Sequence, residues 1–357
     1  MSTPLPQPPF FLIPNINNLR DAALFPSGLP TTTPPGKVRP GILFRSAEVS
    51  KLDQEGWRKV YKIGIGRVFD LRSKPEVDKG WGGIVGGDAA ANDVRPGWIV
   101  GMELEGVARE WVPVFEESDY SPERLAERYS KYMGESVEGF VHAYQDILQN
   151  AGPSFRTILL YLANLPPPPT FLSNNPSAPA PAPASPSPLG ALIHCTAGKD
   201  RTGIFFGLLF SFLGVPAPVI AAEYNLTEHG LASIREEVVA RLMLSPGFKK
   251  YMAAQMDGTT VSTADLAAIL RQQREEEALG AEKKGPVEER PVPPEILEKG
   301  RLAALRMVGA SPESMLGALE MLEREWGSAE GYMRTVCGLG DGELEALRRN
   351  LVVGDEA

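Results

Sequence analysis

The feature that most constrains the fold of this chain is an apolar strand followed, after a short loop, by a long apolar helix. Gly190-Ala-Leu-Ile-His194 has the composition of a buried strand, and Ile204–Val215 is the longest apolar stretch of the sequence. This stretch is shorter than the roughly 20 residues that span a membrane, so we interpret it as a buried helix. A buried strand beside a buried helix is typical of α/β proteins, in which helices cover both faces of a sheet.

The rest of the sequence agrees with that fold class. Further strands are predicted at Gly41–Phe44, Gly66–Leu71 and Trp111–Val114, where short apolar runs occur. Helices are predicted between them from their apolar spacing, at Leu52–Ile63, Glu123–Met133, Val137–Leu148 and Phe155–Leu162. After Cys195 the pattern is almost entirely helical. We therefore predict an α/β fold, with a mostly parallel central sheet flanked by helices and a helical C-terminal half.

Proline divides the chain, because 20 of its 33 prolines lie in residues 1–40 and 166–188. We predict a proline-rich tail over residues 1–14 and one domain over 15–351. Three segments interrupt that domain: a glycine-rich surface excursion at 79–108, a low-complexity insertion at 166–188 and a charged linker at 280–296. The insertion is interpreted as an extended, solvated loop, and a proline-motif ligand for a partner domain is the alternative.

Charge and cysteine content exclude several classes of function. The chain has 36 basic and 45 acidic residues, and its net charge of −9 argues against binding nucleic acid or anionic membrane through its overall field. It has two cysteines and three histidines, too few for a disulfide framework or a Cys/His zinc cage. The N-terminus has no basic, apolar leader pattern. We expect a cytoplasmic protein with no stable membrane insertion.

One segment carries the residues that chemistry requires: Leu192-Ile-His-Cys-Thr-Ala-Gly-Lys-Asp-Arg-Thr-Gly203. A short loop that joins a strand to a helix can turn its backbone N–H groups toward an anion, and Gly198 allows a positive φ. The N-terminus of the following helix adds donors and positive potential, which also favour the thiolate form of Cys195. Arg201 supplies a planar fork that fits two phosphate oxygens. The segment therefore predicts a nucleophile and an anion clamp, and it requires no metal or other cofactor.

Each cysteine and histidine also has a plainer interpretation. Cys195 could be an inert buried cysteine, but the glycine, arginine and threonine at fixed offsets favour catalysis. Cys337 has no such neighbours and is interpreted as structural. His142 and His229 are also interpreted as structural, since no partner is visible in the sequence.

The segment His194-Cys-Thr-Ala-Gly-Lys-Asp-Arg-Thr-Gly203 resembles the signature of cysteine-dependent phosphatases. In its fuller form it resembles the atypical tyrosine/serine (dual-specificity) phosphatases, a family that includes secreted bacterial phosphatases and fungal cytosolic homologues. Leu19 departs from that family, which has an aromatic residue there, and the usual Gly-Gly is missing. Other matching motifs occur in the family's order: Asn18-Leu-Arg-Asp21, Phe44-Arg-Ser46, Asp70-Leu-Arg-Ser73, Trp111-Val-Pro-Val-Phe115 with Asp119-Tyr-Ser-Pro-Glu123 (as in the fungal branch), Glu325-Trp-Gly-Ser328 and Gly338-Leu-Gly340.

The resemblance implies a role for each loop residue. Cys195 is the nucleophile that forms a cysteinyl-phosphate, and Arg201 is the phosphate clamp. Thr202 hydrogen-bonds the thiolate and helps to release the phosphoenzyme. Substrate contacts are expected from Thr196, Ala197, Gly198, Lys199 and Thr202. His194 is expected to brace the loop, with proton transfer as the alternative.

The general acid is left open between two aspartates. The Trp-Pro-Asp loop of many tyrosine phosphatases is absent from this sequence. The resemblance suggests Asp200, next to the clamp, although a carboxylate there could simply pair with a neighbouring base. Asp119, near a predicted strand end with Glu116 and Glu117, is the alternative acid.

Substrate class depends mainly on Lys199. The resemblance associates a lysine there with phosphoinositide phosphatases, whereas Thr196 replaces a second lysine that some of them carry. Lys199 could equally add to the field of a single-phosphate site. We expect hydrolysis of phosphotyrosine and of phosphoserine/threonine or phosphoinositide, so the partners are a phosphorylated protein or a phosphoinositide. The alternatives are a rhodanese-type sulfurtransferase and a non-catalytic phosphate-binding adaptor. Arg45, Asp70 and Arg72 are interpreted as buried ion pairs that support the loop.

Overall fold

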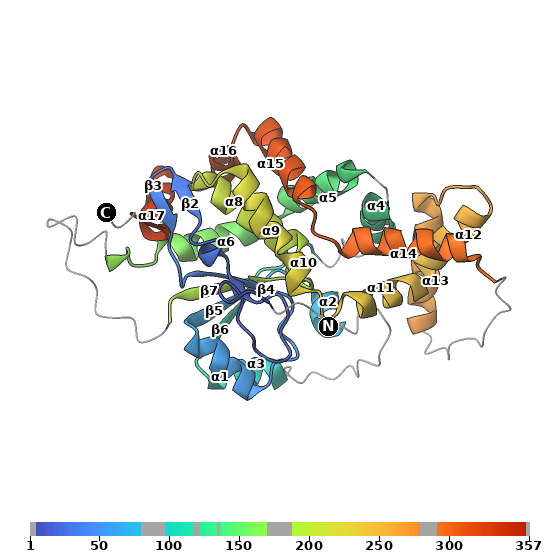
Figure 1. The fold of residues 1–357 in the computed structure, drawn as a ribbon, viewed down its shortest axis with the longest axis horizontal. Helices are drawn as coiled ribbons and strands as arrows, with labels where there is room; N and C mark the ends of the chain where they lie inside the picture. The colour runs from blue at the N-terminus through green and yellow to red at the C-terminus, as the bar shows by residue number, and fades with distance from the viewer. Residues whose placement is uncertain are drawn as a thin grey trace.

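The central sheet has five strands in the order β1-β4-β7-β5-β6 (Figure 1). Its strands are β1 (Arg20–Asp21), β4 (Leu43–Ser46), β5 (Ile65–Asp70), β6 (Ala108–Trp111) and β7 (Gly190–His194). The pairings β4–β7, β5–β7 and β5–β6 are parallel, and only β1 is antiparallel to its neighbour. The computed structural model describes residues 5–79, 97–116, 121–133, 136–169, 188–278 and 291–354. The predicted α/β class and the mostly parallel sheet are confirmed.

Helices cover both faces of this sheet, and one 3₁₀ turn, η1 (Ala22–Leu24), follows β1. The helices are α1 (Gln54–Lys62), α2 (Lys74–Lys79), α3 (Gly97–Leu104), α4 (Pro122–Met133), α5 (Val137–Asn150), α6 (Gly152–Ala163), α8 (Asp200–Phe212), α9 (Ala217–Asn225), α10 (Thr227–Gly230), α11 (Arg235–Leu244), α12 (Pro246–Met256), α13 (Thr263–Ala278), α14 (Pro294–Val308), α15 (Pro312–Trp326), α16 (Ala329–Thr335) and α17 (Asp341–Leu351). In Figure 1, α1 and α3 lie below the sheet, and α6, α8 and α9 lie above it.

Successive side chains of the central strands point to opposite faces of the sheet, and each face has its own hydrophobic core. In β7, Leu192 packs into the core formed with α1 and α3, and Ile193 packs into the larger core on the opposite face. In β5, Val68 and Phe69 divide in the same way. Successive strand side chains point to opposite faces, so a strand buried on both faces must be apolar throughout. This explains why β7 has no polar residue before His194.

The predicted buried helix is α8, which lies in the larger core. Its apolar residues from Ile204 to Phe210 are buried, and it packs against α5, α9 and α15. Each fully buried Leu or Phe side chain contributes about 1.5–3 kcal/mol of transfer free energy. No helix among the described residues is both long enough and apolar enough to cross a bilayer.

Most predicted elements match an observed one within a few residues, and β6 shows the largest offset. The prediction placed this strand at Trp111–Val114, but it ends at Trp111. Pro113 follows closely, and proline has no N–H to continue the ladder. Val112 still donates to the carbonyl of Asp70, the last residue of β5, at 3.0 Å, and Val114 donates to the next carbonyl, that of Leu71, at 3.3 Å. The prediction therefore identified the correct edge of the sheet.

Two predicted irregular segments differ from the structure. Residues 97–108 of the predicted surface excursion form α3 and the start of β6, and Ile99 and Met102 are buried against α1. Within the predicted tail, Phe10 and Ile13 are also buried, and Phe10 bridges to Arg20. Glycine and proline content concealed these apolar contacts. Residues 80–96 of the excursion, 170–187 of the insertion and 280–290 of the charged linker lie outside the described residues.

A second sheet joins distant parts of the chain. It has the order β2-β3-β8, with β2 (Pro30–Thr32), β3 (Pro35–Val38) and β8 (Val352–Val353), and all its pairings are antiparallel. At the other side of the molecule, α11, α12 and α14 enclose a small core of their own, and α13 packs on α4 (Figure 1). Among the described residues after Cys195, regular structure is helical, as predicted, apart from β8.

Candidate active site

The loop from Cys195 to Lys199 connects β7 to α8 at the carboxyl end of the parallel strands. Gly198 has φ +66°, and a Cβ built there would lie 2.1 Å from the carbonyl oxygen of Ser46. The position therefore accepts only glycine, because of both its backbone conformation and its close approach to β4. Asp200 begins α8, so the positive end of a long buried helix faces the loop.

Two buried side chains near the N-terminus hold the carbonyl groups of this loop. Asn18 Nδ2 donates to the carbonyls of Ala197 and Gly198 at 3.2 and 3.4 Å. Arg45 Nη2 donates to the carbonyl of Gly198 at 2.9 Å, and its Nη1 pairs with Glu223 at 2.6 Å. With the carbonyls bound from behind, the loop can direct its N–H groups to the other side. Arg45 therefore has the supporting contacts that the sequence predicted.

Glu223 is shared by two buried arginines. Arg20 Nε lies 2.7 Å from Glu223, and the side chains of Arg20 and Arg45 are 0% exposed. Burial lowers the pKa of Arg20 to about 10, even though Glu223 opposes that shift. Removing one partner of a buried ion pair typically costs about 3–5 kcal/mol, because the other charge is left unpaired. This cluster fixes the loop to β1, β4 and α9.

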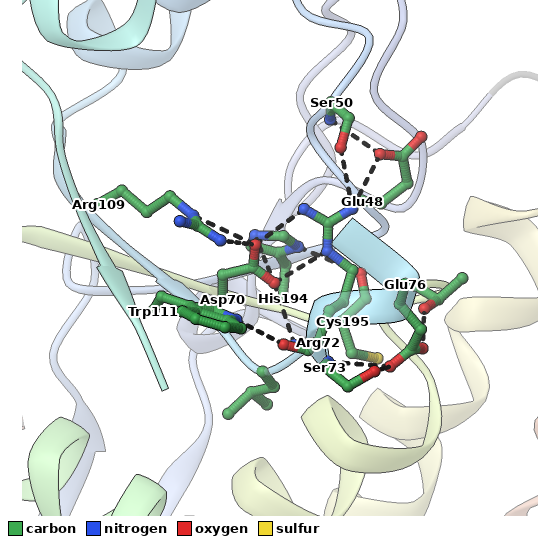
Figure 2. Close-up of polar contacts among 12 residues, drawn as sticks. Glu48, Ser50, Asp70, Arg72, Ser73, Glu76, Arg109, Trp111, His194 and Cys195 are labelled. Carbon is green, nitrogen blue, oxygen red and sulfur yellow. Dashed lines mark hydrogen bonds and ion pairs between the residues drawn. The ribbon is translucent and has the colours of Figure 1, made fainter. Parts of the chain in front are cut away.

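His194 lies behind the cysteine in a second buried cluster (Figure 2). Its Nδ1 is 3.1 Å from the Cys195 carbonyl oxygen, and its Nε2 is 3.6 Å from Asp70. Asp70 also pairs with Arg72 and Arg109, each at 2.8 Å. Burial lowers the pKa of His194 to about 4, although Asp70 opposes that shift. Burial alone would raise the pKa of Asp70, but the opposite charges of Arg72 and Arg109 hold it below its usual range. His194 is therefore neutral at pH 7.

Arg201 lies in the first turn of α8, and its guanidinium is bound by Glu76 of α2. Nη1 and Nη2 of Arg201 donate to the two Glu76 carboxylate oxygens at 2.6 and 2.5 Å. Thr196 Oγ1 donates to the same carboxylate at 2.6 Å, and Ser73 donates through its N–H and Oγ at 3.1 and 3.0 Å. In Figure 2 the Cys195 side chain points toward the contact between Ser73 and Glu76. The predicted clamp and nucleophile thus lie at one place.

Lys199 and Asp200, the two residues that precede Arg201, have different surroundings. Asp200 accepts a hydrogen bond from the Tyr144 hydroxyl at 3.2 Å, and its side chain is 26% exposed. Burial raises the pKa of Tyr144 well above its ordinary value, so this hydroxyl keeps its proton. Lys199 is 3% exposed and donates to the Met307 carbonyl at 2.6 Å. Its ammonium group thus binds α14 and also lies 3.4 Å from the Asp200 carboxylate. The second-phosphate contact expected of Lys199 stays a prediction.

Two other predicted site residues have less support. The hydroxyl oxygen of Thr202 is buried without a hydrogen-bond partner among the described residues, so the predicted bond to Cys195 is not formed here. Asp119, the alternative acid, lies outside the described residues together with Glu117.

An apolar pocket of about 120 Å³ opens next to the loop. The loop residues Thr196, Ala197, Lys199 and Asp200 form one side of it. The opposite wall consists of residues from α10–α11 and α14: Leu231, Ile234, Arg235, Val238, Leu242, Met307 and Val308. An apolar cavity of roughly 150 Å³ is enough to bind benzene, so this pocket is close to the size of one aromatic ring.

Sequence reasoning found the loop itself but missed most of what surrounds it. Glu76 contacts Thr196 and Arg201, and Tyr144 contacts Asp200. Glu223 acts through Arg45, which binds the Gly198 carbonyl. Glu76 did have a local signal, because Ser73-x-x-Glu76 at the start of α2 has the spacing of a capping box. That signal predicts the contact between the two residues, but not the one with Arg201.

Comparison with known proteins agrees with this geometry. The profile of the tyrosine phosphatase family matches residues 11–353. The triple specificity protein phosphatase PtpB of Mycobacterium tuberculosis is 26% identical over 258 residues, which cover 66% of this chain and 81% of PtpB. A tyrosine-protein phosphatase of Nostoc commune is 55% identical over 40 residues, 11% of this chain and 14% of that protein. The chain belongs to the tyrosine phosphatase family, as a cysteine-dependent protein-tyrosine/dual-specificity phosphatase.

Proposed function

We propose that the chain hydrolyses phosphate monoesters through a cysteinyl-phosphate intermediate. The observation that carries this proposal is the position of Cys195 and Arg201 around one loop, at the end of a buried strand and the start of a buried helix. An anion in this loop would meet backbone N–H groups, the helix N-terminus and a guanidinium fork. These groups also stabilise the charge that develops on the phosphoryl oxygens during transfer.

The reaction has two steps. First, Sγ of Cys195 forms a bond to phosphorus while the ester P–O bond breaks, and the leaving oxygen takes a proton from the general acid. Next, water attacks phosphorus and passes a proton back to the same carboxylate, and the S–P bond breaks to release inorganic phosphate. Asp200 is the acid that we propose, since its side chain is partly exposed and lines the pocket beside the loop.

Other residues of the site prepare the loop. His194 is proposed as a brace, because it is fully buried, neutral and hydrogen-bonded to the Cys195 carbonyl. Thr196, Ala197, Gly198 and Thr202 are proposed to contact the phosphate through the loop. The buried Thr202 hydroxyl has a hydrogen bond still to make, which a thiolate or a phosphate oxygen would accept.

Phosphotyrosine is the substrate that the geometry supports best. The adjacent pocket is apolar and close to the size of one ring, so it suits an aryl group bonded to phosphate. Phosphoserine/threonine and phosphoinositide remain part of the proposal, and the M. tuberculosis relative is named a triple specificity phosphatase. The contact between Lys199 and Met307 gives no support to a second phosphate.

The test is phosphate release by the purified chain from a phosphotyrosine peptide, a phosphoserine peptide and a phosphatidylinositol phosphate, assayed in parallel. We expect the phosphotyrosine peptide to be hydrolysed fastest, vanadate to inhibit, and EDTA to leave the rate unchanged. A rate that EDTA removes would contradict cysteine catalysis. Thiocyanate formation from thiosulfate and cyanide would instead identify a sulfurtransferase, and phosphate binding without release would identify an adaptor.

Cytoplasmic location is proposed as well, because both cysteines are free and a catalytic thiol must stay reduced. Cell fractionation tests it. The likeness to the fungal branch depends on two motifs, Trp111–Phe115 and Asp119–Glu123, and remains a prediction.

A further inference from the structure

Two buried tyrosines connect Asp200 to the interior of the protein. The Tyr144 hydroxyl donates to Oδ1 of Asp200 at 3.2 Å, and the hydroxyl oxygens of Tyr144 and Tyr224 are 2.5 Å apart. Tyr144 belongs to α5 and Tyr224 to α9, two of the helices that pack on α8. The two residues are 0% and 1% exposed. Asp200 lines the pocket beside the loop, yet its carboxylate is held by groups of the protein core.

The direction of these hydrogen bonds follows from the chemistry of the carboxylate. An ionised carboxylate only accepts, so the single hydroxyl proton of Tyr144 is used on Asp200. The Tyr144 oxygen is then left to accept, and the Tyr224 hydroxyl donates to it. Burial raises the pKa of both tyrosines above the ordinary value, so both keep their protons at neutral pH. Hydrogen bonds in series polarise one another, which strengthens the last bond, from Tyr144 to Asp200.

Gly203, in the first turn of α8, gives Tyr224 the room for this contact. Asp200 and Gly203 are three residues apart in a helix, so they lie on the same face. A Cβ built at Gly203 would lie 2.8 Å from Cε2 of Tyr224. A larger residue would therefore push the tyrosine ring away from the face of α8 that carries Asp200. The close approach of Tyr224 thus depends on a glycine of the loop segment itself.

The two oxygens of the Asp200 carboxylate have different surroundings. Oδ1 accepts from Tyr144 and lies 3.4 Å from the ammonium group of Lys199, which can only donate. Within the part of the chain that the structure describes, no group donates a hydrogen bond to Oδ2. A proton on Oδ1 would face these donors, whereas a proton on Oδ2 leaves both contacts intact. The acid form of Asp200 therefore carries its proton on Oδ2.

We propose that Tyr144, supported by Tyr224, is a positioning residue for the general acid: it holds Oδ1 of Asp200 so that Oδ2 delivers the proton to the leaving group. This inference rests on the proposed function, because it takes Asp200 as the acid. The proton passes from Oδ2 to the leaving oxygen while the ester P–O bond breaks, and Oδ1 accepts from Tyr144 before and after this step. The tyrosines themselves give up no proton. If their hydroxyls only satisfied each other in the core, losing one would not change the need for a proton.

The experiment compares the full-length chain with Tyr144→Phe, Tyr224→Phe and the control Tyr332→Phe. Tyr332 is equally buried, its hydroxyl donates to the α5 carbonyl of Leu148 at 2.6 Å, and it does not line the pocket. The substrates are benzyl phosphate and para-nitrophenyl phosphate, which each carry one aromatic ring. Benzyl alkoxide is strongly basic and needs a proton to leave, whereas nitrophenoxide leaves readily without one. We measure kcat/KM for both esters and the inhibition constant of inorganic phosphate.

For Tyr144→Phe we expect kcat/KM to fall about fivefold for benzyl phosphate and less than about twofold for para-nitrophenyl phosphate. Tyr224→Phe should show the same preference with a loss of about threefold, because it removes only the hydrogen bond that supports Tyr144. Tyr332→Phe should leave the ratio of the two rates unchanged. Inhibition by phosphate should be the same in all four chains, since none of these residues binds the loop from Cys195 to Lys199.

A double substitution shows whether Tyr144 acts through Asp200. In an Asp200→Asn chain, adding Tyr144→Phe should lower the benzyl phosphate rate by less than about twofold, because the proton that Tyr144 positions is already missing. If Tyr144→Phe slows both esters equally, or its effect persists in the Asp200→Asn chain, the role of Tyr144 is structural and the inference is wrong. If Tyr144→Phe does not fold, the ratio of the two rates in Tyr224→Phe decides the matter.

The inference and the proposed function fail in different ways. If the unmodified chain hydrolyses neither ester, the proposed function is wrong and the inference is wrong with it. If Asp200→Asn selectively slows benzyl phosphate and neither tyrosine variant does so, only the inference is wrong. If Asp200→Asn has no such effect, another group is the acid, and the inference is wrong while cysteine catalysis stands.

Discussion

The two cysteines of this chain are equally buried and differ in what surrounds them. Cys195 and Cys337 are each 2% exposed. Cys337 follows α16 among apolar side chains, and burial raises the pKa of its thiol to about 12, against a weaker opposing effect of Arg156. Cys195 lies beside a helix N-terminus, Arg201 and a loop of backbone donors. Burial by itself therefore does not decide whether a cysteine is inert; the groups that can stabilise its thiolate do.

The largest expected effect separates the two cysteines by substitution. Cys195→Ser should lower the aryl phosphate rate at least about a thousandfold, because a serine hydroxyl is not ionised in this site. Cys337→Ser should change kcat by less than about twofold. Its cost should appear in unfolding experiments, as about 1–3 kcal/mol for a buried hydroxyl. Equal loss of activity in both variants would remove the distinction between the two sites.

Alkylation tests the same distinction without substitution. In the native chain we expect iodoacetate to modify Cys195 about a hundredfold faster than Cys337, since the thiolate is the reactive form. Inorganic phosphate should protect Cys195 and leave Cys337 unaffected. Peptide mass spectrometry after timed quenching gives both rates. Protection of Cys337 by phosphate would contradict a single anion site at the loop.

A smaller expected loss of rate tests which aspartate is the general acid for the reaction at Cys195. Asp200→Asn should lower the rate on an alkyl phosphate at least about tenfold and affect an aryl phosphate less. An alkoxide needs the proton, whereas a phenoxide, with a pKa near 10, leaves more readily without it. Asp119→Asn is the matched comparison. If neither variant reduces the alkyl rate tenfold, both assignments are wrong.

The smallest effect concerns the support of Cys195 by His194. The folded-state pKa of His194 is about 4, below its ordinary value of 6.5, so the unfolded chain binds a proton first as the pH falls. The stability linked to neutral His194 is fully present above pH 6.5 and is lost as the pH falls toward 4. Between pH 6.5 and 5.5 the destabilisation caused by His194→Asn should therefore shrink by about 1 kcal/mol.

Denaturant titrations at the two pH values measure that change. Asp21, whose pKa burial raises to about 6, titrates in both chains, so its contribution cancels in the difference. The stability cost of Cys337→Ser should be the same at both pH values, because its thiol does not titrate there. A His194→Asn cost that is also constant would mean that this histidine is not held neutral by burial.

Local features of the site could be predicted from the sequence, and distant ones could not. Cys195, Gly198 and Arg201 occur within seven consecutive residues, so their spacing alone predicted an anion-binding loop. Asn18 and Glu223 support the same loop from opposite directions along the chain. A single sequence does not reveal such pairings, since no spacing rule connects residues that far apart.

The fold shows the same limit. β5, β7 and α8 were predicted because apolar runs report burial directly. The short strands β3 and β8 were missed, since each exists only through its pairing with the other or with β2. α3 was missed because its glycines and flanking sequence concealed Ile99 and Met102, which are buried in the core formed with α1.

The residues that contact the loop from Cys195 to Lys199 become available in a fixed order as the chain is synthesised. Asn18 and Arg45 bind the loop carbonyls and Glu76 binds Arg201, and all three precede the loop in the sequence. Glu223, the charge partner of Arg45, follows the loop within α9. A nascent chain that has reached α9 thus contains nearly all of them, whereas β3 must wait for β8. The loop can take its shape while the ribosome is still adding the helices that form the far wall of the pocket.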